Sequence, residues 1–169
     1  VRGVGAAANV APDPPSALGQ FKTDGTALAI GAWTNQTSVV LKFTMADTSP
    51  ADTLTPQVEV KPSGTAFNGA GLVAGPAVAS AGAPVQGVVS VAGLANGSQY
   101  HWRARTRDAA GQTSAWVSFG GNTETARDVG VDTSAATGSI VVAGGSVWTK
   151  GRTVNLGLYR HAERVLERD

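Results

Sequence analysis

The sequence predicts an all-β protein, an antiparallel β-sandwich followed by an incomplete second β domain. Three observations lead to this prediction. Small residues and turn formers are abundant, with 22 glycines among 169 residues, while charged residues make up only 15%. Several short segments alternate between apolar and polar residues with the period of a strand, and most of their large apolar residues are valine. One segment from the first third of the chain recurs near its end.

Residues 1–19 show no periodicity, and we interpret them as an extended leader or linker. The run Asp13-Pro14-Pro15 supports this interpretation, because proline fixes its own φ and restricts the residue before it. The first clear strand follows at 39–45. Its inward-facing residues are predicted to be Val39, Leu41, Phe43 and Met45.

The next strands follow from the same alternation. Residues 54–61 place Leu54, Val58 and Val60 inward, and Gln57, Glu59 and Lys61 outward. Residues 62–84 are rich in Gly, Ala and Pro, which predicts a long irregular connection with one short strand around Leu72–Val73. Alternation returns at 85–91.

The most informative strand is the segment 100–107. One face carries Tyr100, Trp102, Ala104 and Thr106, and the other carries His101, Arg103, Arg105 and Arg107. We expect the first face to be inward, with Trp102 in the core. A turn at 109–112 and a last strand at 114–121 complete about six or seven strands, and no helix is predicted before residue 160.

This last part resembles the closing strands of fibronectin type III-like and bacterial Ig-like domains. The matching residues, in chain order, are Leu94, Gly97, Tyr100, Asp108, Gly111, Ser114 and Trp116. The resemblance covers roughly residues 20–125. It implies a β-sandwich at 20–127, a Tyr100 hydroxyl bonded to nearby backbone, and a linker at 128–138 of the kind that joins such domains in secreted bacterial proteins.

An internal repeat predicts the start of a second domain at 139–169. "WTNQTSVVLKF" at 33–43 and "WTKGRTVNLGL" at 148–158 align without a gap, and Trp33 and Trp148 are 115 residues apart (148 − 33). The orphan strands would leave apolar faces exposed. They could pack on the first domain, pair with another chain or belong to a truncated fragment, and we favour pairing between chains. The predicted assembly residues are Ile140, Val142, Trp148, Val154, Leu156 and Leu158.

Composition gives no support for most classes of chemistry. A net charge of +1 offers no footprint for nucleic acid, and no apolar run is long enough to span a membrane. The absence of Cys excludes disulfides and thiolate sites. His101 and His161 lack a nucleophile or carboxylate motif, so we expect surface histidines, no catalytic residues and no cofactor. The acidic residues Asp47, Asp52, Asp108, Asp128 and Asp132 form no calcium loop, so we expect turn residues and no metal site.

One surface patch is predicted, formed by Arg103, Arg105, Arg107 and Trp116. Its structural interpretation is a ladder of stacked side chains that stiffens the sheet, and its functional interpretation is a site for an anion or a sulfated glycan. Trp33 and Trp148 occupy matched positions in the repeat, which favours structural roles over a sugar platform.

The sequence therefore predicts a non-catalytic structural or adhesion module of a bacterial surface protein, located outside the cell or at its surface. Self-association into an oligomer or filament is the expected partnership, with neighbouring domains or a glycan as other partners. The alternative is a carbohydrate-binding module attached to a secreted enzyme. Phage tail proteins also contain domains of this kind.

Overall fold

The computed structural model describes residues 9–49 and 53–134, and every regular element among them except one short 3-10 turn is a strand. These residues belong to a compact unit that extends to Ala135; the second unit, Ala136–Asp169, lies outside the described residues. The elements are β1 Ser16–Phe21, β2 Ala27–Leu28, β3 Ala32–Thr34, β4 Val39–Met45, β5 Thr53–Pro62, β6 Val73–Ala74, β7 Val78–Ala79, β8 Val85–Val91, β9 Gln99–Arg107, β10 Val117–Ser118, the 3-10 turn η1 Phe119–Gly121 and β11 Val129–Val131.

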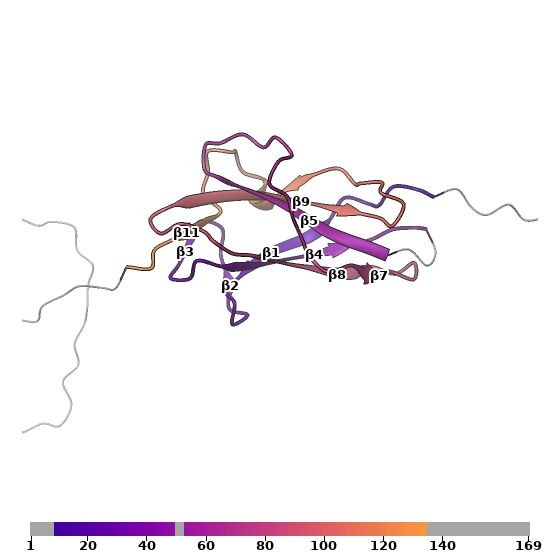
Figure 1. Ribbon diagram of the computed structural model, residues 1–169, viewed down its shortest axis with the longest axis horizontal. Helices are drawn as coiled ribbons and strands as arrows, with labels where there is room; N and C mark the ends of the chain where they lie inside the picture. The colour runs from indigo at the N-terminus through magenta and orange to yellow at the C-terminus, as the bar shows by residue number, and fades with distance from the viewer. Residues whose placement is uncertain (1–8, 50–52, 135–169) are drawn as a thin grey trace, which may run out of the picture. The chain divides into compact units, whose positions relative to one another are not determined.

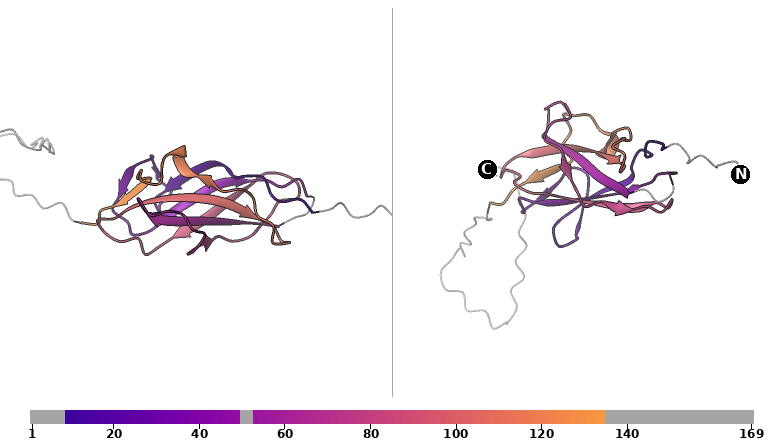
Figure 2. Two further views of the ribbon diagram at one scale, coloured as in Figure 1. Left: turned by 90° about the horizontal axis from the view of Figure 1, so that it is seen from above. Right: turned by 45° about the vertical axis from the view of Figure 1, so that its right-hand side comes forward.

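The strands form two sheets, which confirms the predicted all-β class. The smaller sheet is antiparallel with the order β2-β1-β4-β8. The larger is a mixed, seven-stranded sheet with the order β3-β11-β9-β5-β6, in which β10 also pairs with β9 and β7 with β5. The pair of β3 and β11 is parallel. The two sheets lie face to face in Figures 1 and 2, and neither closes on itself.

Alternation explains the strands at the centre of both sheets. In β4 every second residue is buried, from Val39 to Met45, as the sequence predicts. Strand β8 runs antiparallel to it, with Val91 opposite Val39 and Val85 opposite Met45. Because side chains alternate between the two faces of a strand, one face of each becomes the wall of the core.

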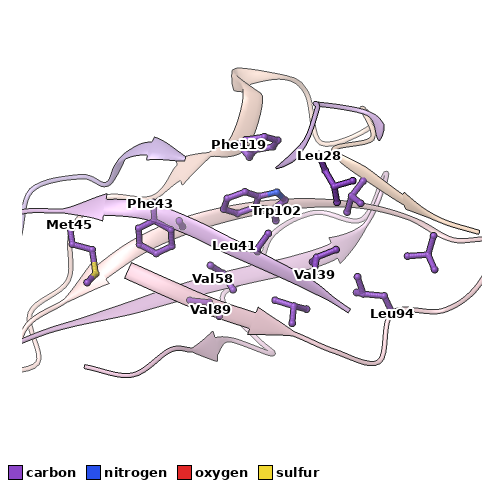
Figure 3. Packing of buried hydrophobic residues seen from close by; sticks show 14 of the residues in the cluster. Leu28, Val39, Leu41, Phe43, Met45, Val58, Val89, Leu94, Trp102 and Phe119 are labelled. Atoms are coloured by element: carbon purple, nitrogen blue, oxygen red, sulfur yellow. The ribbon is translucent and has the colours of Figure 1, made fainter. Parts of the chain in front are cut away.

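The core between the sheets is filled from both sides, as Figure 3 shows. Leu41 and Phe43 of β4 face the larger sheet, from which Val58 of β5 and Trp102 of β9 contribute. Trp102 is only 1% exposed, in agreement with its predicted core position. Its indole stacks on the ring of Phe119 in η1, with centroids 4.8 Å apart.

Two predicted boundaries are wrong. β1 begins at Ser16, inside the predicted leader 1–19, and the amide of Asp13 already donates to the carbonyl of Ala46 at 2.9 Å. β11 lies inside the predicted linker 128–138, and all three of its residues are buried. A strand of three residues is too short for periodicity to reveal, so the sequence offered no signal for β11.

The connection between β5 and β8 contains two short strands instead of the predicted one. Strand β6 pairs with Gln57–Val58 of β5, and β7 pairs with Thr53–Leu54. Between them, Gly75 comes so close to β8 that an added Cβ would lie 2.0 Å from the backbone oxygen of Val88. The segment 73–79 therefore lies between β5 and the edge strand β8, covering an edge that would otherwise be open.

Replacing Gly75 by alanine is expected to lower the free energy of unfolding by about 2–3 kcal/mol, because the clash is with backbone and no rotamer change relieves it. The control is Gly130→Ala, whose Cβ would meet the ring of Trp33 at 2.4 Å. Trp33 is 46% exposed, and a partly exposed side chain can shift more easily than backbone, so we expect a smaller loss than for Gly75→Ala. Urea unfolding of both variants tests this. Equal losses would contradict the account.

Candidate functional site

The predicted arginine patch lies on the outward side of β9. Arg103, Arg105 and Arg107 alternate with core residues along this strand, as the sequence predicts. Their partners on β5 are Glu59, Gln57 and Thr55 in the same order. The structure thus brings Arg103, Arg105 and Trp116 together, and it leaves Arg107 at the exposed end of the row.

Arg103 contacts one carboxylate and two aromatic rings. Its Nε and Nη2 both donate to Oε2 of Glu59, at 2.9 and 2.7 Å. Its guanidinium also packs against two aromatic rings, with centroid distances of 4.6 Å to Phe67 and 4.4 Å to Trp116. A guanidinium with a carboxylate partner and two ring contacts has little capacity left for a ligand.

The side chain of Glu59, on β5, anchors the loop at 63–72. Its side chain is fully buried, and Oε1 accepts the backbone N–H groups of Asn68 and Gly69, both at 2.9 Å. Lys61 Nζ adds an ion pair at 3.5 Å. Burial raises the pKa of this carboxyl, but the hydrogen bonds from Asn68, Arg103 and Gly69 outweigh it, so the pKa lies below its usual value. Glu59 is therefore a charged anchor that the loop depends on.

Arg105 and Trp116 form the other half of the ladder. Arg105 lies 4.6 Å from the ring centroid of Trp116, and its Nε donates to Oε1 of Gln57 at 2.8 Å. The partner of Arg105 on β5 is thus a neutral amide, whereas that of Arg103 is a carboxylate. Arg103 and Arg105 thus both contact Trp116, and the charge of this ladder is balanced only at the Arg103 end.

His101 is buried, so its predicted surface position is wrong. It is 2% exposed, and its ring packs on Phe67 with centroids 4.2 Å apart. Its Nε2 donates to the carbonyl of Thr65 at 2.8 Å, because a carbonyl oxygen only accepts. The strand face is outward as predicted, but the loop 63–72 covers this end of it.

A second polar cluster, which the sequence did not reveal, lies in the interior around Asp128. Its Oδ2 accepts the backbone N–H of Trp102 at 2.9 Å, and its Oδ1 accepts from Nδ2 of Asn122 at 2.8 Å. Gln20 donates from Nε2 to the backbone oxygen of Asp128 at 2.7 Å and accepts from Nε1 of Trp102 at 3.2 Å. This cluster ties β1 of one sheet to β9 and β11 of the other.

The residues in this cluster are far apart in the sequence. Gln20 is 82 residues from Trp102 and 108 residues from Asp128, and Trp102 is 26 residues from Asp128. Asp128 was predicted to be a turn residue and Gln20 carried no prediction. A buried glutamine in a strand follows no local pattern, so only the fold itself identifies its role.

The cluster predicts a pH dependence with a definite sign. Burial raises the pKa of Asp128 above its ordinary value of 3.8, against the opposing hydrogen bonds from Asn122 and Trp102. The folded state then binds more protons than the unfolded state between the two pKa values, so this carboxyl makes stability fall as pH rises through that range. In Asp128→Asn, the amide of Asn122 is expected to turn so that its oxygen accepts from the new side chain. The free energy of unfolding of this variant, relative to that of the wild type, should rise from pH 4 to pH 7.

Glu59→Gln is the matched comparison, and it is expected to show the opposite trend. Because the pKa of Glu59 is lower in the folded state, its carboxylate stabilises the fold at pH values above the pKa of the unfolded state. This stabilisation is lost as the pH falls through the folded-state pKa. Relative to the wild type, Glu59→Gln should therefore lose stability from pH 4 to pH 7. Urea unfolding of both variants at the two pH values measures the trends, and parallel trends would contradict the assigned environments.

The other candidate residues have structural partners. Asp47 accepts the amide of Ser49 at 2.7 Å, and Asp108 accepts the amide of Gln112 at 2.7 Å. These are local turn contacts. In the described ranges, no group of three or more His, Asp or Glu side chains is arranged to hold a metal ion. Trp33 lies over Gly130 and 4.6 Å from the guanidinium of Arg127.

Two sequence predictions remain to be placed. The Tyr100 hydroxyl accepts the amide of Ala95 at 2.8 Å, as the resemblance implied. The predicted assembly residues and His161 lie outside the described residues, as does Asp52. The assembly residues are Ile140, Val142, Trp148, Val154, Leu156 and Leu158.

Comparison of the chain with protein-family models, with curated proteins and with solved structures finds no match. Within 9–49 and 53–134, no helix is long and apolar enough to cross a membrane.

Proposed function

We propose that the described unit is a structural spacer, a non-catalytic β-sandwich module of an extracellular or cell-surface protein. The observation that carries this proposal is the position of its two ends. In Figure 1 the indigo N-terminal end and the orange C-terminal end of the described chain lie at opposite ends of the unit. A module of this form extends a chain in line with its neighbours.

Hydrogen bonds fix both ends in place. Asn9 donates to Asp108 at 2.8 Å, just beyond the C-terminal end of β9. Thr133 donates its amide to Asn96 at 2.8 Å, just before the N-terminal end of β9. The length of β9 therefore separates the points where the described chain enters and leaves. Both ends are attached to the same central strand.

The side chains that suggested chemistry support a structural role. Arg103 and Glu59 hold a loop, and Asp128 and Gln20 connect the sheets, so these polar groups are used within the fold. The fibronectin type III-like assignment belongs to this proposal as well. It is supported by the order of the strands in the two sheets and by the Tyr100 contact. A bacterial surface origin rests on the same resemblance.

Distance measurement between labels at the two ends tests the spacer proposal. The chain has no cysteine, so Val10→Cys with Ser134→Cys gives two unique labelling sites. Pulsed electron spin resonance should give one narrow distribution between about 30 and 40 Å, the length of a strand of this size. Labels at Val10 and Ala110, which lie at the same end, should be much closer. A broad distribution for the first pair would contradict a rigid spacer.

Self-association through the segment 139–158 remains a prediction from the sequence. Sedimentation velocity of the full chain should show association that rises with concentration. Val154→Asp with Leu156→Asp should abolish it, because charges on the apolar face of a strand oppose burial. Thr153→Asp with Asn155→Asp, on the other face of the predicted strand, is the control and should retain association. A monomer at all concentrations would contradict the prediction.

A further inference from the structure

Among the described residues, two guanidinium groups on the outward face of the larger sheet, those of Arg105 and Arg107, have no carboxylate partner. Both ion pairs found among the described residues are made to Glu59, by Lys61 and Arg103. Arg105 bonds only to the neutral amide of Gln57, and Arg107 is exposed. The carboxylate of Asp108 beside them is 2% exposed and accepts from Asn9 and Gln112. Positive charge is therefore concentrated at the C-terminal end of β9.

The spacing of Arg105 and Arg107 suits a polymer that carries anionic groups at intervals along its length. Arg105 and Arg107 are two residues apart on one face of a strand, which places their Cα atoms about 7 Å apart. The stack on Trp116 and the bond from Nε to Gln57 restrict the Arg105 side chain, and neither contact uses the hydrogen-bond donors of its terminal Nη atoms. Preorganised groups lose less entropy when they bind.

The surroundings suit a sugar more than a bare ion. Thr55 and Thr113 lie opposite Arg107 on either side, and their hydroxyl groups are suited to hydrogen bonds with sugar hydroxyls. Trp116 provides half-buried aromatic surface next to Arg105. The site is an open sheet face, which accommodates an extended chain.

We propose that Arg105 and Arg107, with Trp116 beside them, bind an acidic polysaccharide through its carboxylate or sulfate groups. This binding is a property beyond the spacer role and does not depend on it. Each contact is a charge-assisted hydrogen bond to a guanidinium, and a polymer presents many such groups to the same site. Arg103 is excluded from the site because Glu59 neutralises it.

Binding of the full chain to three polymers at low and at 0.5 M salt tests the proposal. The probes are polygalacturonate for carboxylate, dextran sulfate for sulfate, and neutral dextran. We expect binding to one or both acidic polymers, loss of that binding at high salt, and none to dextran. The polymer that binds assigns the anionic group. Absence of binding to both acidic polymers at low salt would overturn the proposal.

Matched variants locate the site. Arg105→Gln with Arg107→Gln should reduce affinity at least tenfold. Lys22→Gln with Lys42→Gln removes the same charge just after β1 and from β4 of the smaller sheet, and should change affinity less than twofold. Arg107→Glu is a second test, since Arg107 is exposed and its replacement leaves the ladder intact; it should also reduce affinity at least tenfold. Equal losses in the lysine variant, or preferential binding of poly-glutamate over both polysaccharides, would overturn the proposal.

Discussion

Replacing Glu59 by alanine is expected to lower the free energy of unfolding by about 3 kcal/mol, the size of loss found when one partner of a buried ion pair is removed. The substitution leaves the guanidinium of Arg103 without its carboxylate and removes the acceptor for the amides of Asn68 and Gly69. Arg103 retains 19% side-chain exposure, so water partly replaces the lost contact and keeps the cost near the lower end of the range.

Glu124→Ala is the control for this variant. Glu124 is exposed, and its side chain accepts one long contact of 3.4 Å from the amide of Phe67; its backbone bond from Gly64 is kept in alanine. Its removal changes the net charge equally and should cost less than about 0.5 kcal/mol. Urea unfolding followed by circular dichroism compares the two variants. Similar losses would show that Glu59 does not anchor the loop at 63–72.

Replacing Trp102 by alanine is expected to have an effect at least as large, about 3–5 kcal/mol. The indole is 1% exposed, stacks on Phe119 and donates to the buried amide oxygen of Gln20 at 3.2 Å. Alanine would leave a cavity between the sheets and a buried acceptor without its donor. Both effects act at the contact that joins the two sheets.

Trp33→Ala is the matched tryptophan control. Trp33 is 46% exposed and rests on Gly130 at the edge of the larger sheet, so its removal creates no closed cavity. We expect a loss of about 1 kcal/mol or less. Urea unfolding of both variants gives the comparison. A loss for Trp33→Ala that equals that for Trp102→Ala would contradict the assignment of Trp102 as the core tryptophan.

The strands that alternate over seven or more residues could be predicted from the sequence. In β4 and β9 the faces of Phe43, Trp102 and Arg105 are as expected, because a strand in a two-sheet structure has one dry and one wet side. The register across β5 could not be predicted. It pairs Glu59 with Arg103, and pairing depends on contacts distant in sequence.

The predicted exposure of side chains is wrong mainly where a loop covers the outward face of a strand. His101 of β9 and Glu59 of β5 are on the outward face as predicted, yet both are buried because the loop that contains Phe67 and Asn68 covers them. Alternation reports the direction of a side chain and carries no information on what lies above it. The same limit hid the cluster of Gln20 and Asp128, which exists only because β1 and β11 meet in space.

The arginine patch shows how the structure sharpens a sequence motif. The sequence presents Arg103, Arg105 and Arg107 as equivalent residues on one face. The partners on β5 distinguish them, since only Arg103 faces a carboxylate. Arg103 is therefore a partner within the fold, and the functional interpretation of the patch remains a proposal that concerns Arg105 and Arg107.

Mechanical unfolding tests the spacer role most directly. Force applied through Val10→Cys and Ser134→Cys acts along β1 and β11, so the ladder bonds of these strands to their neighbours are strained together. Handles at Val10 and Ala110 are the control. They lie at one end of the unit, so force between them breaks the hydrogen bonds between strands one after another. Residues 10–134, at about 3.6 Å each, extend to roughly 450 Å. We predict one unfolding step of slightly less than this length, at a higher force than for the second pair of handles. Unfolding at equal or lower force, or in several small steps, would contradict the spacer role.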